Sequence, residues 1–290
     1  MLSYAIFSGI TLGGMYALVA MGLTLQYGVS RIMNLAYGEL VIVASFIAFV
    51  FMTSFGINPI VGLLIIIPLS FALNWVIYRI LLTPLVARAK NRGMLEVDSI
   101  LATFGLLFIV QGVLLVWFGG NYYSYDFMNG AVNVFGAVIA ANRLVALGFA
   151  VVIGLGFYVI LTRTRIGTAL RAVAVDPTSA RLVAIDVNFA SCFAFALGGA
   201  MAAVGGVLVS MFLTFSTSMG VVFTMKALIV VIMGGVGNLL GALIAGLILG
   251  VAESLVATYV DPGLTIAVTY VIFLLVLLIK PSGLFGRASS

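Results

Sequence analysis

Long apolar runs separated by short polar stretches occupy nearly the whole 290-residue chain. They lie at about 3–28, 37–55, 58–82, 99–118, 143–162, 188–213, 217–235, 238–256 and 262–280. Each run holds 19–26 residues, enough for a helix to cross about 30 Å of hydrocarbon. In lipid only a helix satisfies its own backbone hydrogen bonds. The pattern therefore predicts an all-α, polytopic transmembrane helix bundle of eight or nine spans.

The run at 217–235 differs from the others. Lys226 lies inside it, and the Gly-Gly-Val-Gly stretch at 234–237 ends it. A charge within a span is costly in hydrocarbon, and glycine weakens a helix. We expect a short or discontinuous helix here, and this run decides between eight and nine full spans.

The composition supports a membrane protein and excludes several functional classes. Hydrophobic residues make up 64% of the chain and charged residues 7%, against roughly 25% charged residues in a soluble domain. No polar stretch is long enough for a separate soluble domain, so we expect one transmembrane domain over residues 1–290. Histidine is absent and Cys192 is the single cysteine, which excludes a disulfide within the chain and disfavours a Cys/His metal site.

The motifs of common enzymes are missing as well. The glycines at 234–237 are not followed by the Lys-Ser/Thr pair of a phosphate-binding loop, and the sequence has no His-Glu-x-x-His motif. We therefore expect no enzymatic activity, no metal and no cofactor. The net charge of +5 lies mostly in loops beside the apolar runs, so it does not indicate a nucleic-acid partner.

Basic residues predict the orientation, because loops rich in Lys and Arg stay in the cytoplasm. If loops 79–98 and 163–187 and the C-terminal tail share one side, that side holds 11 of the 13 basic residues. These are Arg31, Arg79, Arg88, Lys90, Arg92, Arg163, Arg165, Arg171, Arg181, Lys280 and Arg287. The N-terminus is then outside, the C-terminus is cytoplasmic, and the tyrosine-rich loop 119–142 is external.

The polar loop at about 163–187 is more than a connection between spans. It carries four arginines and the sequence Asp176-Pro177. Asp can cap the free N–H groups of a helix start, and Pro fits the first helical turn. The stretch from Gly167 to Ala174 also favours a helix. We expect two short helices with a break at Val175-Asp176; the alternative is a plain cytoplasmic loop with arginines that snorkel.

A few polar side chains lie within the apolar runs, and such groups usually face a cavity or each other. They are Gln26, Asn34, Glu39, Asn74, Gln111, Lys226 and Glu253. Arg31, Asn34 and Glu39 would cluster at the inner end of the first two spans. That cluster is either a polar turn with Arg31 and Glu39 paired, or a gate or pathway lining to which Gln26, Gln111 and Glu253 also contribute. Lys226 and Glu253 lie on neighbouring antiparallel runs, and we expect them to pair.

Glycines recur four residues apart in several runs. Gly237 and Gly241, Gly246 and Gly250, and Gly9 and Gly13 form small-xxx-small patterns, which let helices approach closely in lipid. We expect Gly237, Gly241 and Gly246 to serve in helix packing.

Several segments, taken in order, resemble one family of transport proteins. They are Gly22-Leu23-Thr24-Leu25-Gln26-Tyr27-Gly28, Asn34-Leu35-Ala36-Tyr37-Gly38-Glu39, Arg165-Ile166-Gly167, Arg171-Ala172-Val173-Ala174-Val175-Asp176-Pro177, Ala180-Arg181-Leu182 and Gly234-Gly235-Val236-Gly237-Asn238. Together they resemble the permease subunits of branched-chain (hydrophobic) amino acid importers of the ATP-binding-cassette class. The chain departs from that pattern at Tyr37, where many members have His, and after Asn238, where a proline is missing.

The resemblance implies a fold similar to that of type II-like importer permeases and a defined set of partners. A second homologous permease subunit would complete the translocation path, two ATPase subunits would bind beneath it, and an external, periplasmic binding protein would deliver the amino acid. Loop 163–187 would be the coupling element, with Arg171, Asp176, Pro177 and Arg181 facing the ATPase. The location would be the bacterial inner membrane.

Other functions remain open from the sequence. Related systems carry urea, short amides or small aromatic acids. A secondary transporter that works alone would be expected to bury more acidic residues in its spans, and a membrane enzyme or scaffold would not need a structured basic loop. The sequence does not identify the substrate.

Overall fold

The computed structural model of the chain describes residues 1–89, 91–134 and 137–286, so Lys90 and Arg287 lie outside the described residues. The helices are α1 (Leu2–Ser30), α2 (Tyr37–Phe55), α3 (Pro59–Ile77), α4 (Thr83–Arg88), α5 (Arg92–Phe118), α6 (Ala141–Arg163), α7 (Arg165–Val175), α8 (Pro177–Leu182), α9 (Val187–Ser210), α10 (Gly220–Gly234), α11 (Leu239–Tyr259) and α12 (Thr265–Ile279). A π-helical turn (Tyr78–Leu82) joins α3 to α4, and a 3₁₀ turn (Pro262–Leu264) precedes α12.

Within the described residues, eight helices are long and apolar enough to cross a membrane. This confirms the expected polytopic helical bundle. α10 is the exception: its 15 residues correspond to about 22 Å of helix, less than the thickness of the hydrocarbon. The run that the sequence marked as doubtful is therefore a short helix.

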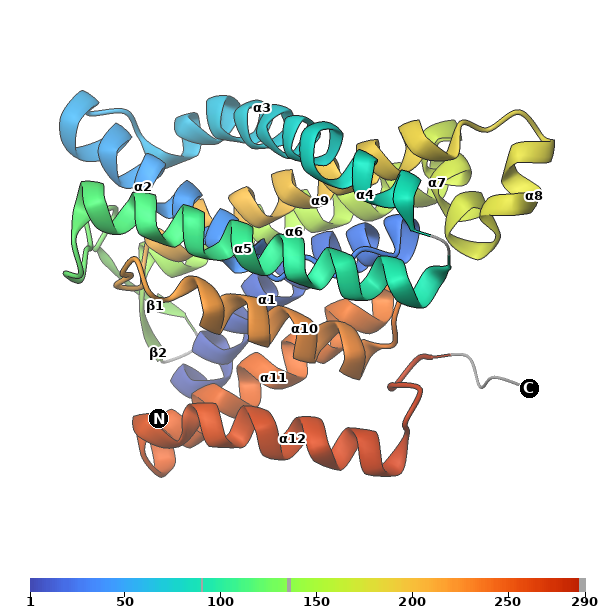
Figure 1. Cartoon of the computed structure of the whole chain (residues 1–290). Coiled ribbons are helices and arrows are strands. Elements are labelled where there is room, and N and C mark those ends of the chain that lie inside the picture. The colour runs from blue at the N-terminus through green and yellow to red at the C-terminus, as the bar shows by residue number, and fades with distance from the viewer. Residues whose placement is uncertain (90, 135–136, 287–290) are drawn as a thin grey trace.

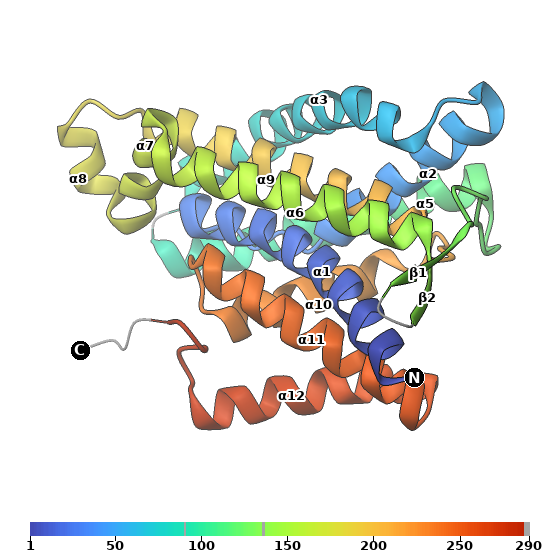
Figure 2. The same ribbon diagram turned by 180° about the vertical axis from the view of Figure 1, so that it is seen from behind.

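Two helices form the centre of the bundle. α1 and α9 are largely buried, whereas α3, α5 and α12 expose most of their side chains. Figure 1 shows α1 and α9 between α3 on one edge and α12 on the other, with α5 in front. Figure 2 shows α6 covering the opposite face. The N-terminus lies at one end of the bundle, and α7, α8 and the last turn of α12 lie at the other (Figures 1 and 2).

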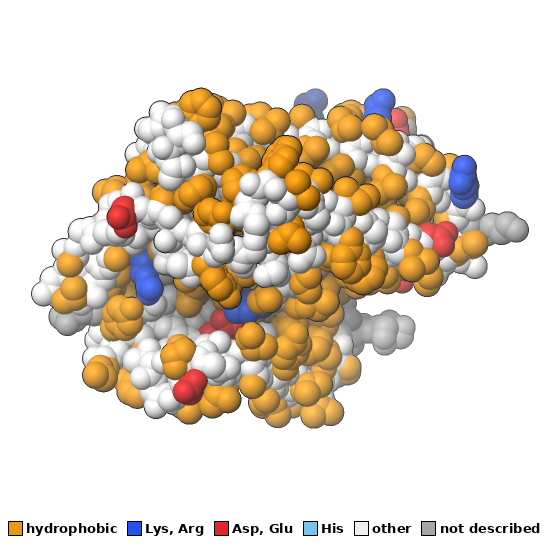
Figure 3. Space-filling view, turned by 60° about the vertical axis from the view of Figure 1, so that its left-hand side comes forward, with side chains coloured by type: hydrophobic (Ala, Val, Ile, Leu, Met, Phe, Trp, Pro, Cys, Tyr) orange, Lys and Arg blue, Asp and Glu red, His pale blue; other side chains and the backbone are white. Residues whose placement is uncertain are grey.

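The outer surface is suited to lipid rather than water. Leu64, Val116 and Leu278 are each more than three-quarters exposed, at 76%, 83% and 81%. Figure 3 shows hydrophobic side chains over most of one face, with few charged groups. A soluble protein rarely exposes apolar surface of this extent, so these helices are stable only in a membrane.

The end of the bundle near the N-terminus carries a small hairpin. β1 (Ala131–Val134) pairs antiparallel with β2 (Ala137–Ala140), within a loop for which the sequence predicted no strands. Tyr125 anchors this loop, because its hydroxyl lies 2.8 Å from the hydroxyl of Ser210 at the end of α9. Burial raises the pKa of Tyr125 to about 12, so the anchor keeps its proton at physiological pH.

Glycines bring α1 and α11 into backbone contact. A Cβ added at Gly13 would lie 2.7 Å from the Cα of Leu247, and one at Gly246 would lie 2.6 Å from the backbone nitrogen of Ala17. Gly250 faces Gly13 in the same way. Backbones this close gain dispersion energy that larger side chains would prevent, so these glycines hold α1 and α11 together.

The glycines near the start of α11 act differently from one another. Gly241 packs against the backbone of Gly234 at the end of α10. Gly237 does not pack helices together, which corrects the sequence-based prediction. It lies in the turn before α11 with φ +82, and a Cβ there would meet no atom within 4 Å. Its role is the positive φ angle, which L-residues adopt with difficulty.

Adjacent glycines of α1 offer a matched test of this packing. Gly13→Ala should lower the free energy of unfolding by about 1–3 kcal/mol, because overpacking forces the two backbones apart. Gly14→Ala is the control, since a Cβ there would lie 3.4 Å from the flexible Cδ1 of Leu147, an ordinary contact. Thermal unfolding in detergent measures both. Equal melting temperatures of the two variants would contradict close packing at Gly13.

Candidate functional site

α2 does not begin at the level where α1 ends, although only residues 31–36 separate the two helices. The Tyr37 hydroxyl lies 2.8 Å from the carbonyl oxygen of Val19 and 3.0 Å from that of Gly198. Val19 precedes the last residue of α1 by eleven residues, roughly 16 Å along the helix axis. Gly198 lies in the middle of α9. The chain therefore turns back into the bundle, and α2 starts at an internal level.

This reversal corrects the predicted position of Glu39. The side chain lies in the first turn of α2 and is 0% exposed, so it is inside the bundle and not in a polar turn at its inner end. It does not pair with Arg31, since neither of its carboxylate oxygens has a hydrogen-bond partner within the described chain. Arg31 donates instead to the carbonyl oxygen of Ala174 in α7, at 3.0 Å.

Polar side chains hold the returning segment in place. The Asn34 amide donates to the Gln26 side-chain oxygen at 3.2 Å, and Gln26 donates to the carbonyl of Phe195 at 2.7 Å. The backbone N–H of Leu35 donates to the Thr103 hydroxyl at 3.1 Å. Non-helical backbone at membrane depth needs such partners, because lipid offers none. Two predicted pathway residues, Gln26 and Asn34, thus meet at this segment.

α10 begins at the same internal level, beside the start of α2. The backbone N–H of Gly38 donates to the Thr224 hydroxyl at 2.8 Å, and that hydroxyl lies 3.1 Å from the carbonyl of Leu35. A Cβ on Gly38 would overlap the backbone carbonyl oxygen of Gly220, so only glycine fits at position 38. A Cβ on Gly220 would overlap the Glu39 carboxylate and would force that side chain to move. The first turns of α2 and α10 therefore meet inside the bundle.

The Glu39 carboxylate lies against the N-terminal turn of α10. Neither of its oxygens has a hydrogen-bond partner within the described chain. A buried charge is costly, but a helix N-terminus carries roughly half a positive charge and stabilises an anion. The geometry thus explains how a carboxylate is tolerated here, and it leaves the hydrogen-bonding capacity of both oxygens unused.

A second buried polar cluster joins four helices. Lys226 of α10 lies 2.8 Å from Glu253 of α11 and donates to the Tyr16 hydroxyl of α1 at 2.7 Å. Tyr16 donates to Glu253 at 2.9 Å, and the Thr269 hydroxyl of α12 donates to the other oxygen of Glu253. The predicted pairing of Lys226 and Glu253 is confirmed, and the cluster ties α10, α11 and α12 to the centre.

Gln111 is not brought into either cluster. It is half-buried on α5, and its side chain makes no hydrogen bond within the described chain. It lies eight residues beyond Thr103, roughly 12 Å along the helix.

The described residues also contain no group of His, Cys, Asp and Glu side chains that could hold a metal ion.

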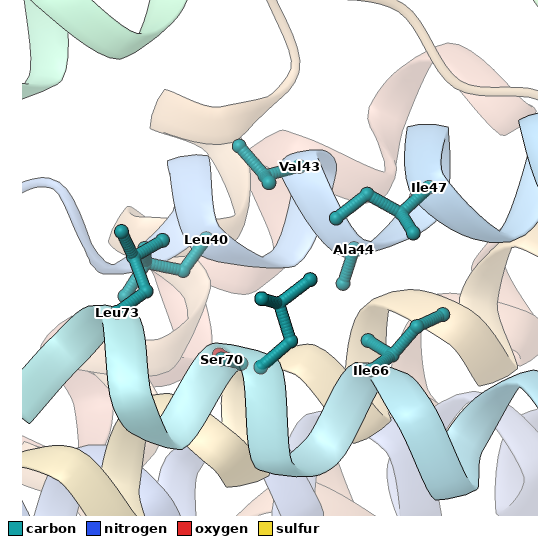
Figure 4. Close-up of a pocket in the computed structure, with 8 residues that line it drawn as sticks. Leu40, Val43, Ala44, Ile47, Ile66, Ser70 and Leu73 are labelled. Atoms are coloured by element: carbon teal, nitrogen blue, oxygen red, sulfur yellow. The ribbon is translucent and has the colours of Figure 1, made fainter.

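The surface between α2 and α3 contains an apolar cavity of about 160 Å³. Figure 4 shows Leu40, Val43, Ala44 and Ile47 of α2 facing Ile66, Ser70 and Leu73 of α3; Leu69 completes the lining. The single polar group is the Ser70 hydroxyl, which donates to the carbonyl of Gly199 at 3.0 Å. No group in this cavity can neutralise a charged ligand, so it suits hydrocarbon.

The loop at the opposite end from the N-terminus consists of two short helices, as predicted. Asp176 ends α7 and caps α8, accepting a hydrogen bond from the backbone N–H of Thr178 at 2.9 Å. α7 is fixed to the bundle by buried Leu170 and Val173. Arg171 and Arg181 are exposed on the surface of this loop.

Sequence reasoning missed Tyr37, Gly220 and Thr224, which lie where the first turns of α2 and α10 meet. Tyr37 was noted only as a departure from a family pattern. Its hydroxyl in fact bonds to the backbones of α1 and α9. A signal for the other two existed, because the polar stretch Ser216-Thr217-Ser218 precedes Gly220 within an apolar region.

Comparisons with known proteins agree with this architecture. A family model described as the permease component of the branched-chain amino acid transport system matches residues 5–279. The high-affinity branched-chain amino acid transport system permease protein LivH of Escherichia coli (strain K12) is 30% identical over 298 residues, covering 97% of this chain and 94% of that protein. The corresponding protein BraD of Pseudomonas aeruginosa is 28% identical over 97% of this chain and 94% of its own length.

One solved structure is similar over nearly the whole chain. PsaBC from Streptococcus pneumoniae, in complex with Fab, aligns with a TM-score of 0.53 and 14% identity, covering 98% of this chain and 93% of that chain. At this identity the likeness shows the fold alone, and it supports the helical architecture described above.

The cluster around Glu253 allows a stability test. Lys226→Met should destabilise the protein by about 3–5 kcal/mol, because it leaves Glu253 buried without its cation. Combining it with Glu253→Gln should restore part of that loss, since the uncompensated charge is gone. Asp261→Asn, at an exposed turn, is the control. Thermal unfolding of the parent, Lys226→Met, Glu253→Gln, the double variant and the control measures the coupling, and a loss in the double variant equal to the sum of the two single losses would contradict it.

Proposed function

The chain belongs to the family of permease components of branched-chain amino acid transport systems, and from that membership we propose that it forms half of the translocation path of an ATP-driven importer. Its cargo is a branched-chain or other hydrophobic amino acid. The names of the relatives from Escherichia coli and Pseudomonas aeruginosa support this substrate class. No structural observation favours urea, amides or aromatic acids.

The importer needs subunits that this chain does not provide. The sequence has no phosphate-binding loop, so ATP hydrolysis takes place on two partner ATPase subunits. A second homologous permease subunit supplies the other half of the path, and an external binding protein delivers the amino acid. The surrounding membrane is the bacterial inner membrane.

The main support for the proposal comes from α7 and α8, which lie together at one end of the bundle (Figure 1). There they can form a contact surface for a partner. The cap at Asp176-Pro177 fixes the angle between them, and exposed Arg171 and Arg181 offer charge-assisted hydrogen bonds to an acidic groove. The bond from Arg31 to Ala174 links this surface to the segment that enters the bundle. An ATPase bound to α7 and α8 is therefore connected through Arg31 to residues 31–36 and the first turn of α2.

The path itself runs beside the returning segment and the first turns of α2 and α10. Gln26, Asn34 and Glu39 border it on the side of α1 and α2. Gln111 lies further along α5, and Glu253 contributes by holding Lys226 and thereby the position of α10. Polar groups at this depth are costly unless they serve a path or each other.

Reversing charge on the coupling surface tests the proposal. Arg171→Glu combined with Arg181→Glu should leave membrane insertion intact and abolish binding of the ATPase subunits or amino acid uptake, because both charges would then repel an acidic groove. Co-purification with the ATPase and uptake into cells are the measurements.

Arg88→Glu combined with Lys280→Glu is the matched control, since it reverses two exposed charges away from α7 and α8. We expect this pair to retain ATPase binding. Uptake and ATPase stimulation at parental levels in the Arg171/Arg181 double variant would show that this loop is not the coupling element.

The orientation is a separate prediction, based on the basic residues near α7, α8 and the C-terminus. In a Cys192→Ala background, a membrane-impermeant thiol reagent added outside intact cells should label Tyr122→Cys and not Ser179→Cys. Disruption of the cells should make the second position accessible. Labelling of Ser179→Cys in intact cells would reverse the topology.

A further inference from the structure

The first turn of α10 has unused hydrogen-bond donors. The first N–H groups of a helix have no partner within it, and those of Gly220, Val221 and Val222 make no hydrogen bond within the described chain. By contrast, the start of α2 is satisfied: Gly38 donates to Thr224, and Glu39 donates to the carbonyl of Ala36. Free donors are thus confined to the α10 end of the junction.

Unused acceptors lie directly beside these donors. Both oxygens of Glu39 lack a hydrogen-bond partner in the described chain, and the side chain is 0% exposed. The carboxylate points at Gly220, where an added Cβ would overlap it. An ionised carboxylate has about four acceptor positions, and contact with a helix dipole uses none of them.

The charges at this junction nearly cancel. The N-terminus of α10 contributes roughly half a positive charge and the adjoining end of α2 a similar amount, while Glu39 contributes one negative charge. A ligand with a net charge would upset that balance in a low-dielectric interior. A ligand that is neutral overall, with one positive and one negative group, would not.

The surface of α10 offers an apolar path next to these groups. Val221, Val222 and Met225 are exposed on one side of the helix, at 36%, 38% and 41%. Further along the same helix, Leu228 and Ile232 help to line an apolar cavity of about 150 Å³ that also includes Leu23, Tyr27, Met33, Val231 and Val236. Backbone N–H groups beside such a surface cannot face lipid, so this face lies either against another protein surface or along a water-filled path.

We propose that the first turn of α10 and the Glu39 carboxylate form a site for the charged head of an α-amino acid in transit. The N–H groups of Gly220, Val221 and Val222 bind its carboxylate, Glu39 binds its ammonium group, and its alkyl side chain lies on Val221, Val222 and Met225. The site is closed over Glu39 in this structure and opens when the first turns of α2 and α10 separate. This inference rests on the proposed function and adds a recognition site within the permease.

The competing explanation gives Glu39 a purely structural role, as a fixed countercharge to the end of α10. The two explanations differ in ligand selectivity. A countercharge stabilises the helix junction for every ligand equally. A binding group discriminates between ligands that have an ammonium group and ligands that lack it.

The experiment uses the assembled importer, with its partner permease and ATPase subunits and without the binding protein, in lipid nanodiscs. Saturation-transfer NMR follows the methyl groups of leucine, of leucinamide, which lacks the carboxylate, and of 4-methylpentanoate, which lacks the ammonium group. We expect leucine to bind at least about tenfold more tightly than either analogue, because each analogue loses a charge-assisted contact. Equal binding of all three, or no binding of leucine, would overturn the proposed site without any variant.

Variants then assign the ammonium contact to Glu39. Glu39→Gln should weaken the binding of leucine about tenfold or more and should not weaken the binding of 4-methylpentanoate, which has no ammonium group and would lose only the repulsion by the Glu39 charge. Glu96→Gln, a carboxylate on α5 that accepts a bond from Tyr27 at 3.3 Å, is the control and should bind leucine like the parent. Equal losses for leucine and 4-methylpentanoate in Glu39→Gln would support the structural role and overturn the proposal. If Glu39→Gln does not assemble, the analogue series on the parent decides.

Uptake separates this inference from the proposed function. If the complete parental system with its binding protein imports no amino acid, the proposed function itself fails. If it imports leucine while the permease shows no discrimination between leucine and its analogues, only the binding site fails.

Discussion

The junction between α2 and α10 depends on one electrostatic arrangement. Two helix N-termini meet inside the bundle, and each carries a partial positive charge. The Glu39 carboxylate lies between them, 0% exposed, where no water can screen either charge. Removing it would leave two like partial charges in contact at low dielectric. Gly38, Gly220 and the returning segment 31–36 together bring that carboxylate to this place.

Close approach at the junction and between α1 and α11 has the same physical basis. Lipid offers no hydrophobic driving force between helices, so contact distance decides how strongly they associate. Gly38 and Gly220 let two first turns touch, and Gly13, Gly246 and Gly250 let α1 and α11 touch. The polar cluster of Lys226 and Glu253 then fixes α10 at a second point. Dispersion and paired charges thus stabilise the association of these helices, which in a soluble protein is stabilised mainly by the hydrophobic effect.

Local rules explain which features the sequence predicted. The helix break at Asp176-Pro177 depends on the side-chain cap of Asp176 and the pyrrolidine ring of Pro177, so it was predicted to within two residues. The pairing of Lys226 with Glu253 was predicted because an unpaired charge within a membrane span costs free energy. The depth of Glu39 was not predicted, because the reversal of residues 31–36 is set by distant partners, Gln26, Thr103 and Thr224. Gly237 was assigned to packing because spacing alone does not distinguish a helix from the turn before it.

The length of α1 has a mechanical consequence. Its 29 residues form a rod about 43 Å long, and Arg31 at its end is bonded to α7. Near its other end, Gly9 and Gly13 touch the backbone of α11. A tilt of only about 3° around the middle of such a rod moves each end by on the order of 1 Å. If a displacement of α7 tilted α1 about its buried middle, the two ends of α1 would move in opposite directions by comparable distances.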